Sequence, residues 1–310
     1  MTHAHLVSEG WVDYELLDSG EGMKLERFGQ MILARLETQA LWAKGRPDIW
    51  KDAHAEFHSE GGKGAWHQRK EVPPPALGWE MSHSPLRFLA RLTSFKHVGV
   101  FPEQEPNWSW LRARVLDVGR PTSESDVGRR TSHIPSILNL FGYTGIATLA
   151  AVHAGAKVTH VDASKQSLDW AHENAQLTGL PEDAVRWILD DALAFAKREA
   201  RRGAKYDGII LDPPAFGRGP KGEVWHIERD LPTLLTALRE LLAERAGAFF
   251  LMSGYAAGYS AYAFAQALES AFGTVEGEGG LPAQAGELHI REAASERVVP
   301  SGIYCRFVRE

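Results

Sequence analysis

Apolar runs and amphipathic stretches alternate regularly from Ser136 onward. The strand-like runs are SILNL (136–140), KVTHV (157–161), VRWIL (185–189), DGIIL (207–211) and AFFLM (248–252). Between and after them, helices are predicted to begin near Ile146, Ser164, Asp191, Ile227 and Tyr259. Near-continuous apolar strands that alternate with helices predict a parallel sheet covered on both faces. ELHIRE (287–292) and YCRFV (304–308) are expected to close it as an antiparallel pair. The prediction is a doubly wound, mostly parallel α/β sheet of seven strands.

Residues 1–110 follow a different pattern, with short alternating runs broken by Gly and Pro and seven of the ten tryptophans. They predict a small, strand-rich N-terminal domain. Residues 111–135 are expected to hold an edge strand, around VLDVG (115–119), and a polar linker. Residues 136–310 would then form the main domain.

Composition indicates the cellular compartment and restricts the binding partners to be expected. There is no run of about 18 apolar residues and no basic, apolar leader at the start, so neither a membrane span nor a signal peptide is expected. The single cysteine, Cys305, cannot form a disulfide within the chain, which favours the reducing cytoplasm. With a net charge of -6, nucleic-acid binding would need a local basic patch.

Candidate chemistry follows the strands, because doubly wound sheets bind ligands at the carboxyl ends of their strands. The first strand runs into a turn with Gly142 and Gly145, where the backbone can approach a ligand closely or simply turn into a helix. Asp162 ends the second strand, at about the spacing of a ribose-binding acid; it could also cap the next helix.

The third and fourth strands add further acids. Of Asp190 and Asp191, one could accept a hydrogen bond from an adenine amino group while the other caps a helix, and Asp191 is preferred for the ligand. The fourth strand ends in Asp212-Pro213-Pro214-Ala215-Phe216-Gly217, where two prolines fix a rigid loop. This loop presents the Asp212 carboxylate, the Pro213 carbonyl and the Phe216 ring.

NLFGYTG, VDAS, LDDALAF and DPPAFG, in this order, resemble the motifs of class I S-adenosylmethionine (SAM) dependent methyltransferases. Within them, the chain is most similar to bacterial DPPxF-type enzymes that methylate bases of large-subunit ribosomal RNA. The resemblance implies a Rossmann-like sheet, SAM as cofactor, an RNA substrate and no metal. It also implies a set of cofactor contacts: Asn139, Phe141, Gly142, Tyr143, Thr144, Gly145, Asp162, Ala163, Asp191, Ala192 and, from a segment closing over the cofactor, Gln104.

The same resemblance places Asp212, Pro213 and Phe216 at the methyl acceptor. After the fifth strand this chain has Ser253-Gly254-Tyr255 where many relatives have a cysteine, and Cys305 lies far from every motif. Direct transfer to a nitrogen or oxygen, without a covalent intermediate, is therefore expected. The N-terminal region does not resemble the RNA-binding module common in these enzymes.

Alternative interpretations remain at this point. The same fold could methylate a small molecule or a protein side chain, or could lack activity. An NAD-dependent oxidoreductase is disfavoured because the turn between the first strand and its helix, FGYTG, lacks Gly-x-Gly-x-x-Gly, and because DPPAF is present. His54 and His58 have the spacing of a zinc pair on one helix face, but no third ligand is apparent. Basic residues near 197–202 fit the end of a helix.

Overall fold

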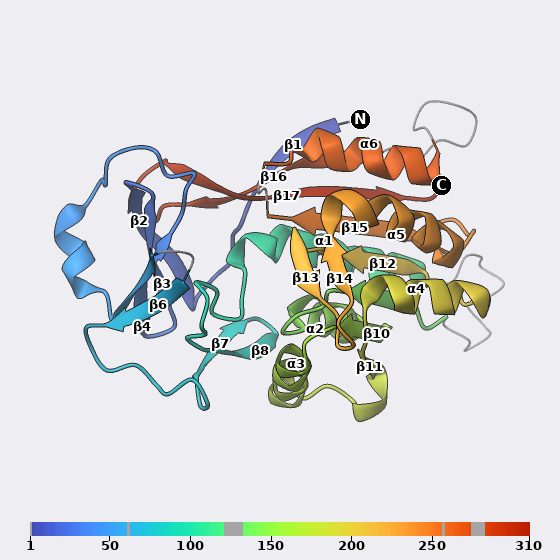
Figure 1. The fold of residues 1–310 in the computed structure, drawn as a ribbon, viewed down its shortest axis with the longest axis horizontal. Coiled ribbons are helices and arrows are strands. Elements are labelled where there is room, and N and C mark those ends of the chain that lie inside the picture. The colour runs from blue at the N-terminus through green and yellow to red at the C-terminus, as the bar shows by residue number, and fades with distance from the viewer. Residues whose placement is uncertain (1, 61–62, 121–132, 256–257, 274–282) are drawn as a thin grey trace. The chain divides into compact units, whose positions relative to one another are not determined.

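The computed structural model describes residues 2–60, 63–120, 133–255, 258–273 and 283–310 (Figure 1). Most of the predicted linker, residues 121–132, lies outside these ranges. The chain forms two compact units. The first contains Met1–His5, Asn107–Glu287 and Gly302–Glu310, and the second contains Leu6–Pro106 and Leu288–Ser301. The domain boundaries expected near 110 and 135 stay a prediction.

The main sheet confirms the α/β prediction. Its eight strands lie in the order β1, β16, β17, β15, β12, β9, β10, β11. Their bounds are β1 (Thr2–Val7), β9 (Ser136–Leu140), β10 (Lys157–Asp162), β11 (Val185–Leu189), β12 (Gly208–Leu211), β15 (Phe249–Gly254), β16 (Gln284–Arg291) and β17 (Val298–Val308). From β15 to β11 neighbouring strands are parallel, whereas β17 runs antiparallel to β15. The expected seven strands are all present, and β1 adds an eighth.

Helices cover the sheet in two groups, α2 with α3, and α4 and α6 on either side of α5. The chain moves from β9 outward to β10 and β11, then returns to β12 and β15 on the other side of β9. Since such crossovers are right-handed, this reversal places the two groups on opposite faces. The bounds are α1 (Glu105–Val118), α2 (Ile146–His153), α3 (Lys165–Thr178), α4 (Ala192–Arg201), α5 (Ile227–Leu241) and α6 (Ala261–Phe272).

The second unit is strand-rich, as expected. One sheet joins β2 (Tyr14–Gly20), β3 (Met23–Phe28), β4 (Met31–Leu36), β5 (Ala55–Glu60) and β6 (Lys63–Gln68). A separate hairpin pairs β7 (Trp79–His83) with β8 (Leu86–Ala90). The short 3-10 helices η1 (Pro47–Asp52) and η2 (Pro102–Gln104) complete this part. No helix within the described ranges is long and apolar enough to cross a membrane.

Two local predictions are wrong. Val115 and Val118 lie in α1, not in an edge strand, because Leu111, Val115 and Val118 recur at helical spacing and are all buried. His54 and His58 do not share a helix face, since His58 lies in β5 and His54 precedes that strand. The Nδ1 of His54 instead accepts a hydrogen bond from the Ile32 backbone N–H at 3.1 Å.

Candidate active site

The predicted motifs come together at one edge of the main sheet. Strands β12, β9, β10 and β11 are consecutive neighbours and parallel, so their carboxyl ends meet at the same edge. Asp212, Phe141, Asp162 and Asp190 therefore stand at four successive strand ends, about 4.8 Å apart from one strand to the next. This row is long enough for an extended ligand and its acceptor.

The turn after β9 has an unusual backbone. Phe141, Tyr143 and Gly145 all adopt positive φ, at 55°, 49° and 84°. A Cβ on Gly142 would lie 2.4 Å from a ring carbon of His160, so only glycine fits there. Gly145 leads into α2, and its N–H donates to the Gly142 carbonyl at 3.0 Å. The loop 141–145 is therefore a tight, fixed cradle.

A buried polar network supports this loop from below. The Asn139 amide donates to the Thr148 hydroxyl at 2.9 Å, and that hydroxyl lies 2.9 Å from the His160 Nδ1. Burial lowers the pKa of His160 to about 3, so its ring is neutral. Thr144 is held as well, because Asn174 donates to its carbonyl at 2.9 Å. Asn139, predicted as a ligand contact, thus points its amide into the network under the loop.

Asp162 joins the loop to the second strand. Its Oδ2 accepts the Tyr143 backbone N–H at 2.9 Å, and its Oδ1 accepts the Ser164 N–H at 2.8 Å. Ser164, not Asp162, caps α3 with its side chain. The Ala163 backbone N–H also hydrogen-bonds this carboxylate. Since a carboxylate has about four lone-pair sites, capacity for one further hydrogen bond remains. Burial raises the pKa of Asp162 above its ordinary value. Ala163 follows it, half-buried.

Asp190 and Asp191, which follow β11, have different hydrogen-bond partners. Both oxygens of Asp190 are engaged, one by the Asp191 N–H at 3.0 Å and the other by Arg198 at 2.6 Å. Asp191 caps α4, since its Oδ1 accepts the Ala194 N–H at 2.8 Å. The expected division is therefore wrong about the cap: Asp191, the acid preferred for the ligand from the sequence, caps the helix because it stands directly before α4. Its Oδ2 makes no hydrogen bond within the described part of the chain. Ala192 is buried as the first residue of α4.

Asp191 also lines a hollow of about 280 Å³. Its other lining residues are Leu193, Ala194, Lys197, Glu223, Val224, Trp225 and Asp230. The hollow therefore lies between the start of α4 and the hairpin of β13 (Phe216–Arg218) and β14 (Val224–His226). Its lining combines apolar side chains with three carboxylates, those of Asp191, Glu223 and Asp230, and the Lys197 amine. Carboxylates can accept hydrogen bonds from an amino group at the edge of a planar ring.

The loop after β12 is fixed by a residue that the sequence did not indicate. Trp225 is 3% exposed, and its indole N–H donates a hydrogen bond to the Pro214 carbonyl at 2.7 Å. Its ring packs against the Phe141 ring, with the ring centroids 5.1 Å apart. It therefore ties the Asp212–Phe216 loop to the loop after β9. Pro213 is buried, whereas Phe216 is 50% exposed. A tryptophan 12 residues after a strand-end proline carries no pattern that would have identified it.

Two positions bear on whether a catalytic thiol is present: Cys305, and the segment Ser253-Gly254-Tyr255 where many relatives have a cysteine. Cys305 lies in β17 opposite Met252, is fully buried, and burial raises its pKa to about 12. It is therefore a core residue, far along the chain from the strand-end motifs. Ser253 lies within β15 and is buried, whereas Tyr255 directly follows the strand and is 36% exposed.

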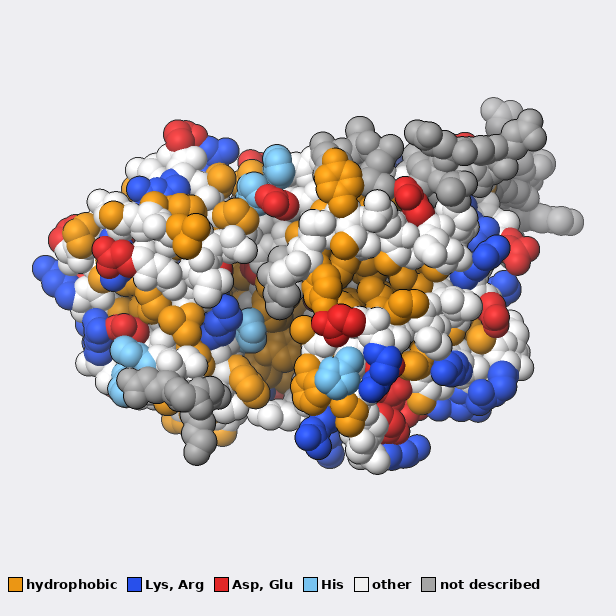
Figure 2. Space-filling model, turned by 45° about the horizontal axis from the view of Figure 1, so that its top comes forward, with side chains coloured by type: hydrophobic (Ala, Val, Ile, Leu, Met, Phe, Trp, Pro, Cys, Tyr) orange, Lys and Arg blue, Asp and Glu red, His pale blue; other side chains and the backbone are white. Residues whose placement is uncertain are grey.

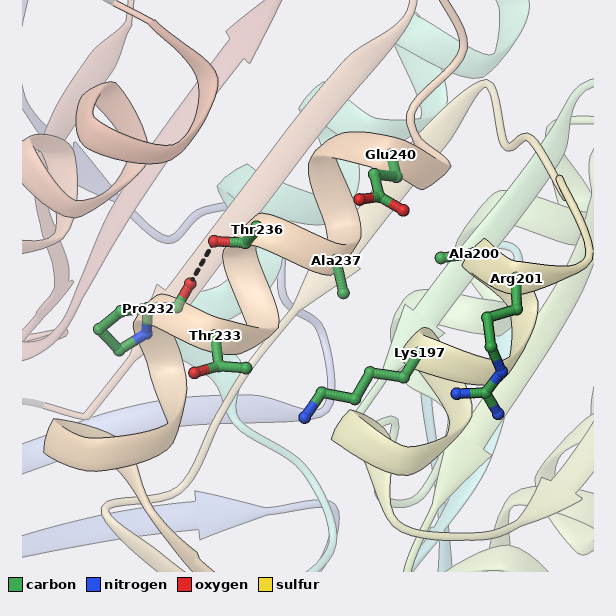
Figure 3. A pocket seen from close by; sticks show the side chains of 8 residues that line it. All are labelled: Lys197, Ala200, Arg201, Pro232, Thr233, Thr236, Ala237 and Glu240. Atoms are coloured by element: carbon green, nitrogen blue, oxygen red, sulfur yellow. Dashed lines mark hydrogen bonds between the residues drawn. The ribbon is translucent and has the colours of Figure 1, made fainter.

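A larger groove of about 480 Å³ lies between α4 and α5, away from the strand ends. Figure 3 shows the Lys197 side chain of α4 extending toward Thr233 of α5, whereas the Thr236 hydroxyl turns back to the Pro232 carbonyl. Lysine and arginine side chains gather at the right-hand end of the face in Figure 2, the side where α4 lies. Four basic residues lie at the end of α4: Lys197, Arg198, Arg201 and Arg202. Two of them form ion pairs within the protein, Arg198 with Asp190 and Arg202 with Glu199. No predicted site residue lines the groove.

Gln104 belongs to the second unit, where it is buried at the end of η2. Its contact with the cofactor stays a prediction. The residues at the sheet edge do fit an extended nucleoside with an amino-acid tail. The glycines of the loop 141–145 let its backbone pack closely on His160 and Ala171, Asp162 keeps acceptor capacity for a ribose hydroxyl, and Asp191 borders a hollow of about 280 Å³.

Comparison with known proteins agrees with this geometry. A family model described as S-adenosylmethionine-dependent methyltransferase matches residues 74–283. A crystal structure of a SAM-dependent methyltransferase from Agrobacterium tumefaciens is 39% identical, with a TM-score of 0.88, and the match covers 100% of this chain and 95% of that one. A Streptococcus mutans protein described as a putative SAM-dependent methyltransferase shares the fold at 17% identity and a TM-score of 0.71, over 97% of this chain and 76% of that one.

Curated relatives match a shorter stretch. Proteins named ribosomal RNA large subunit methyltransferase K/L are 42% identical over 107 residues in Vibrio cholerae and 34% identical over 173 residues in Stutzerimonas stutzeri. These matches cover 34% and 55% of this chain but only 15% and 21% of the relatives. The chain thus spans about a fifth or less of their length. The family model and the full-length structural match establish that this chain belongs to the S-adenosylmethionine-dependent methyltransferases.

Proposed function

We propose that this enzyme methylates a base of ribosomal RNA by direct transfer to a nitrogen. The observation that carries the proposal is the row of strand ends, where the rigid Asp212–Phe216 loop stands beside the loop 141–145 and is tied to it by Trp225. The relatives named as ribosomal RNA methyltransferases, and the expected cytoplasmic location, support RNA as the substrate class.

The cofactor would lie across three strand ends. The loop 141–145 holds the methionine end, Asp162 accepts a hydrogen bond from a ribose hydroxyl, and Asp191 borders the adenine edge. When bound, SAM would supply a methyl group to an acceptor atom that attacks the methyl carbon in line, while the carbon–sulfur bond breaks and the sulfur leaves as a thioether. The protein's part is to hold donor and acceptor in that line and to keep water out.

Asp212, Pro213 and Phe216 orient the acceptor. The Asp212 carboxylate and the Pro213 carbonyl accept hydrogen bonds from an amino group on the base, while the Phe216 ring stacks on its face. A base nitrogen is favoured over a pyrimidine carbon because activation of that carbon needs a thiolate. Cys305 cannot supply one, since it is buried in β17 with a raised pKa.

The net charge of -6 favours a second candidate, a small molecule or a protein side chain as acceptor. One experiment separates the two. Purified enzyme is incubated with methyl-labelled SAM and, in parallel, with unmodified large-subunit ribosomal RNA, transfer RNA or a protein extract. Label in the ribosomal RNA is expected. Label only in the transfer RNA or only in the protein extract would overturn the proposal.

A further inference from the structure

The β13–β14 hairpin has two faces of opposite character. In its antiparallel register Phe216 lies opposite His226, and Arg218 lies opposite Val224. Residues directly opposite each other share a face, and alternate residues along a strand point to opposite faces. Phe216, Arg218, Val224 and His226 therefore form one face, here called the hairpin face, whereas Trp225 belongs to the other.

Burial follows this division. Trp225 is buried as the brace between the two loops, whereas all four residues of the hairpin face are exposed. Phe216 is 50% and Val224 40% exposed, and the Phe216 and His226 rings meet edge to face with centroids 5.0 Å apart. The hairpin already has an anchor in Trp225, so its own packing does not require these apolar and aromatic groups in solvent. Such exposed groups commonly mark a binding surface.

The hairpin face also carries a positive charge, the Arg218 guanidinium, that can pair with a ligand. No hydrogen bond or ion pair engages the Arg218 side chain within the described ranges, whereas nearby Arg229 pairs with Asp230 at 2.7 Å. Aromatic and imidazole rings that stack on bases, next to a guanidinium that meets phosphate, are the chemistry by which proteins hold single-stranded RNA.

We infer that the hairpin face binds the unpaired nucleotides beside the target base. Phe216 contacts the target base, His226 stacks on its neighbour, and Arg218 pairs with a phosphate between them. The hairpin face lies next to the proposed acceptor site, because β13 directly follows Asp212-Pro213-Pro214-Ala215 in the chain. This inference rests on the proposed RNA substrate and adds the contacts that would recognise it.

The test compares His226→Ala and Arg218→Ala with matched controls on other surfaces of the same unit. His153→Ala removes an exposed histidine at the end of α2, and Arg201→Ala removes an exposed arginine at the end of α4. Methyl transfer to unmodified large-subunit RNA gives KM and kcat. Binding of a fluorescein-labelled single-stranded RNA is followed across salt concentrations, and SAM affinity is measured by calorimetry.

His226→Ala should raise the KM for RNA about tenfold, the usual effect of losing one stacked base, and His226→Phe should restore most of it. Arg218→Ala should weaken RNA binding and reduce its salt dependence by roughly one phosphate contact. SAM affinity should stay within about twofold of the parent in all variants.

Two failures can be told apart. RNA methylation by the parent, with both hairpin variants matching their controls in KM and salt dependence, would overturn the hairpin face alone. Absence of label in any RNA from the parent enzyme would overturn the proposed function, and the hairpin face with it.

Discussion

The Trp225 indole N–H donates a 2.7 Å hydrogen bond to the Pro214 carbonyl, while the same ring packs on Phe141. Trp225→Phe should remove the hydrogen bond and keep most of the packing. A net hydrogen bond contributes about 1 kcal/mol, so turnover is expected to fall about fivefold with little change in SAM affinity. Trp225→Ala should also lower the free energy of unfolding by about 3 kcal/mol or more. Steady-state kinetics and denaturant unfolding measure both, and unaltered turnover in Trp225→Phe would show that the brace is not needed.

Gly142→Ala should weaken SAM binding by tenfold or more, because the new methyl group would meet the His160 ring at 2.4 Å. The loop 141–145 must then shift. Gly142→Ala combined with His160→Ala gives the methyl group space, so calorimetry should show partial recovery of affinity. His160→Ala alone serves as the control for loss of the buried network. No recovery in the double variant would mean that the clash is not the cause.

Asp162→Ala should weaken SAM binding by more than about tenfold, since it removes a charged acceptor. The pH dependence gives a second check. Asp162 must be ionised to be a charged acceptor for a ribose hydroxyl, and burial raises its pKa. Affinity should therefore be full above that raised pKa and fall as the pH is lowered through it, at a higher pH than for an ordinary aspartate. Asp162→Asn should lose this dependence, and a parent-like pH profile in that variant would exclude Asp162 as its source.

Cys305→Ser should keep most of the methyl-transfer activity. The thiol is fully buried opposite Met252, so a hydroxyl there costs stability, about 1–3 kcal/mol, without touching the site. The variant is checked for folding and SAM binding before its activity is measured. RNA containing a fluorinated pyrimidine should form no covalent adduct with the parent. A trapped adduct, or an inactive variant that still folds and binds SAM, would argue for a nucleophilic cysteine.

The strand-end motifs were predictable because periodicity, glycines and strand-end acids coincide in one stretch. SILNL matches β9 residue for residue, and the expected helix starts at Ile146 and Ile227 are those of α2 and α5. Ser164 and Asp191 were expected near helix starts, and both cap their helices with side-chain oxygens. Short-range patterns of this kind are fixed by local geometry.

The features that could not be predicted from the sequence depend on tertiary contacts. VLDVG resembles a strand, yet in α1 its valines are buried together with Leu111, one turn earlier. The hairpin strands β13 and β14 have three residues each, too few for any periodicity. Trp225 gains its role only from Pro214 and Phe141, which the chain brings next to it by folding.

Asp212 provides the most direct test of base methylation at this sheet edge. The parent and Asp212→Ala are each incubated with heavy-methyl SAM and unmodified large-subunit RNA, and the digested nucleosides are analysed by mass spectrometry. The parent should place the label on a base nitrogen. Asp212→Ala should lose at least about a hundredfold of this turnover while its SAM affinity stays within about threefold, because its contact forms with the acceptor and not with the cofactor. Label on a pyrimidine carbon or a ribose oxygen, or equal turnover in the two proteins, would contradict the account.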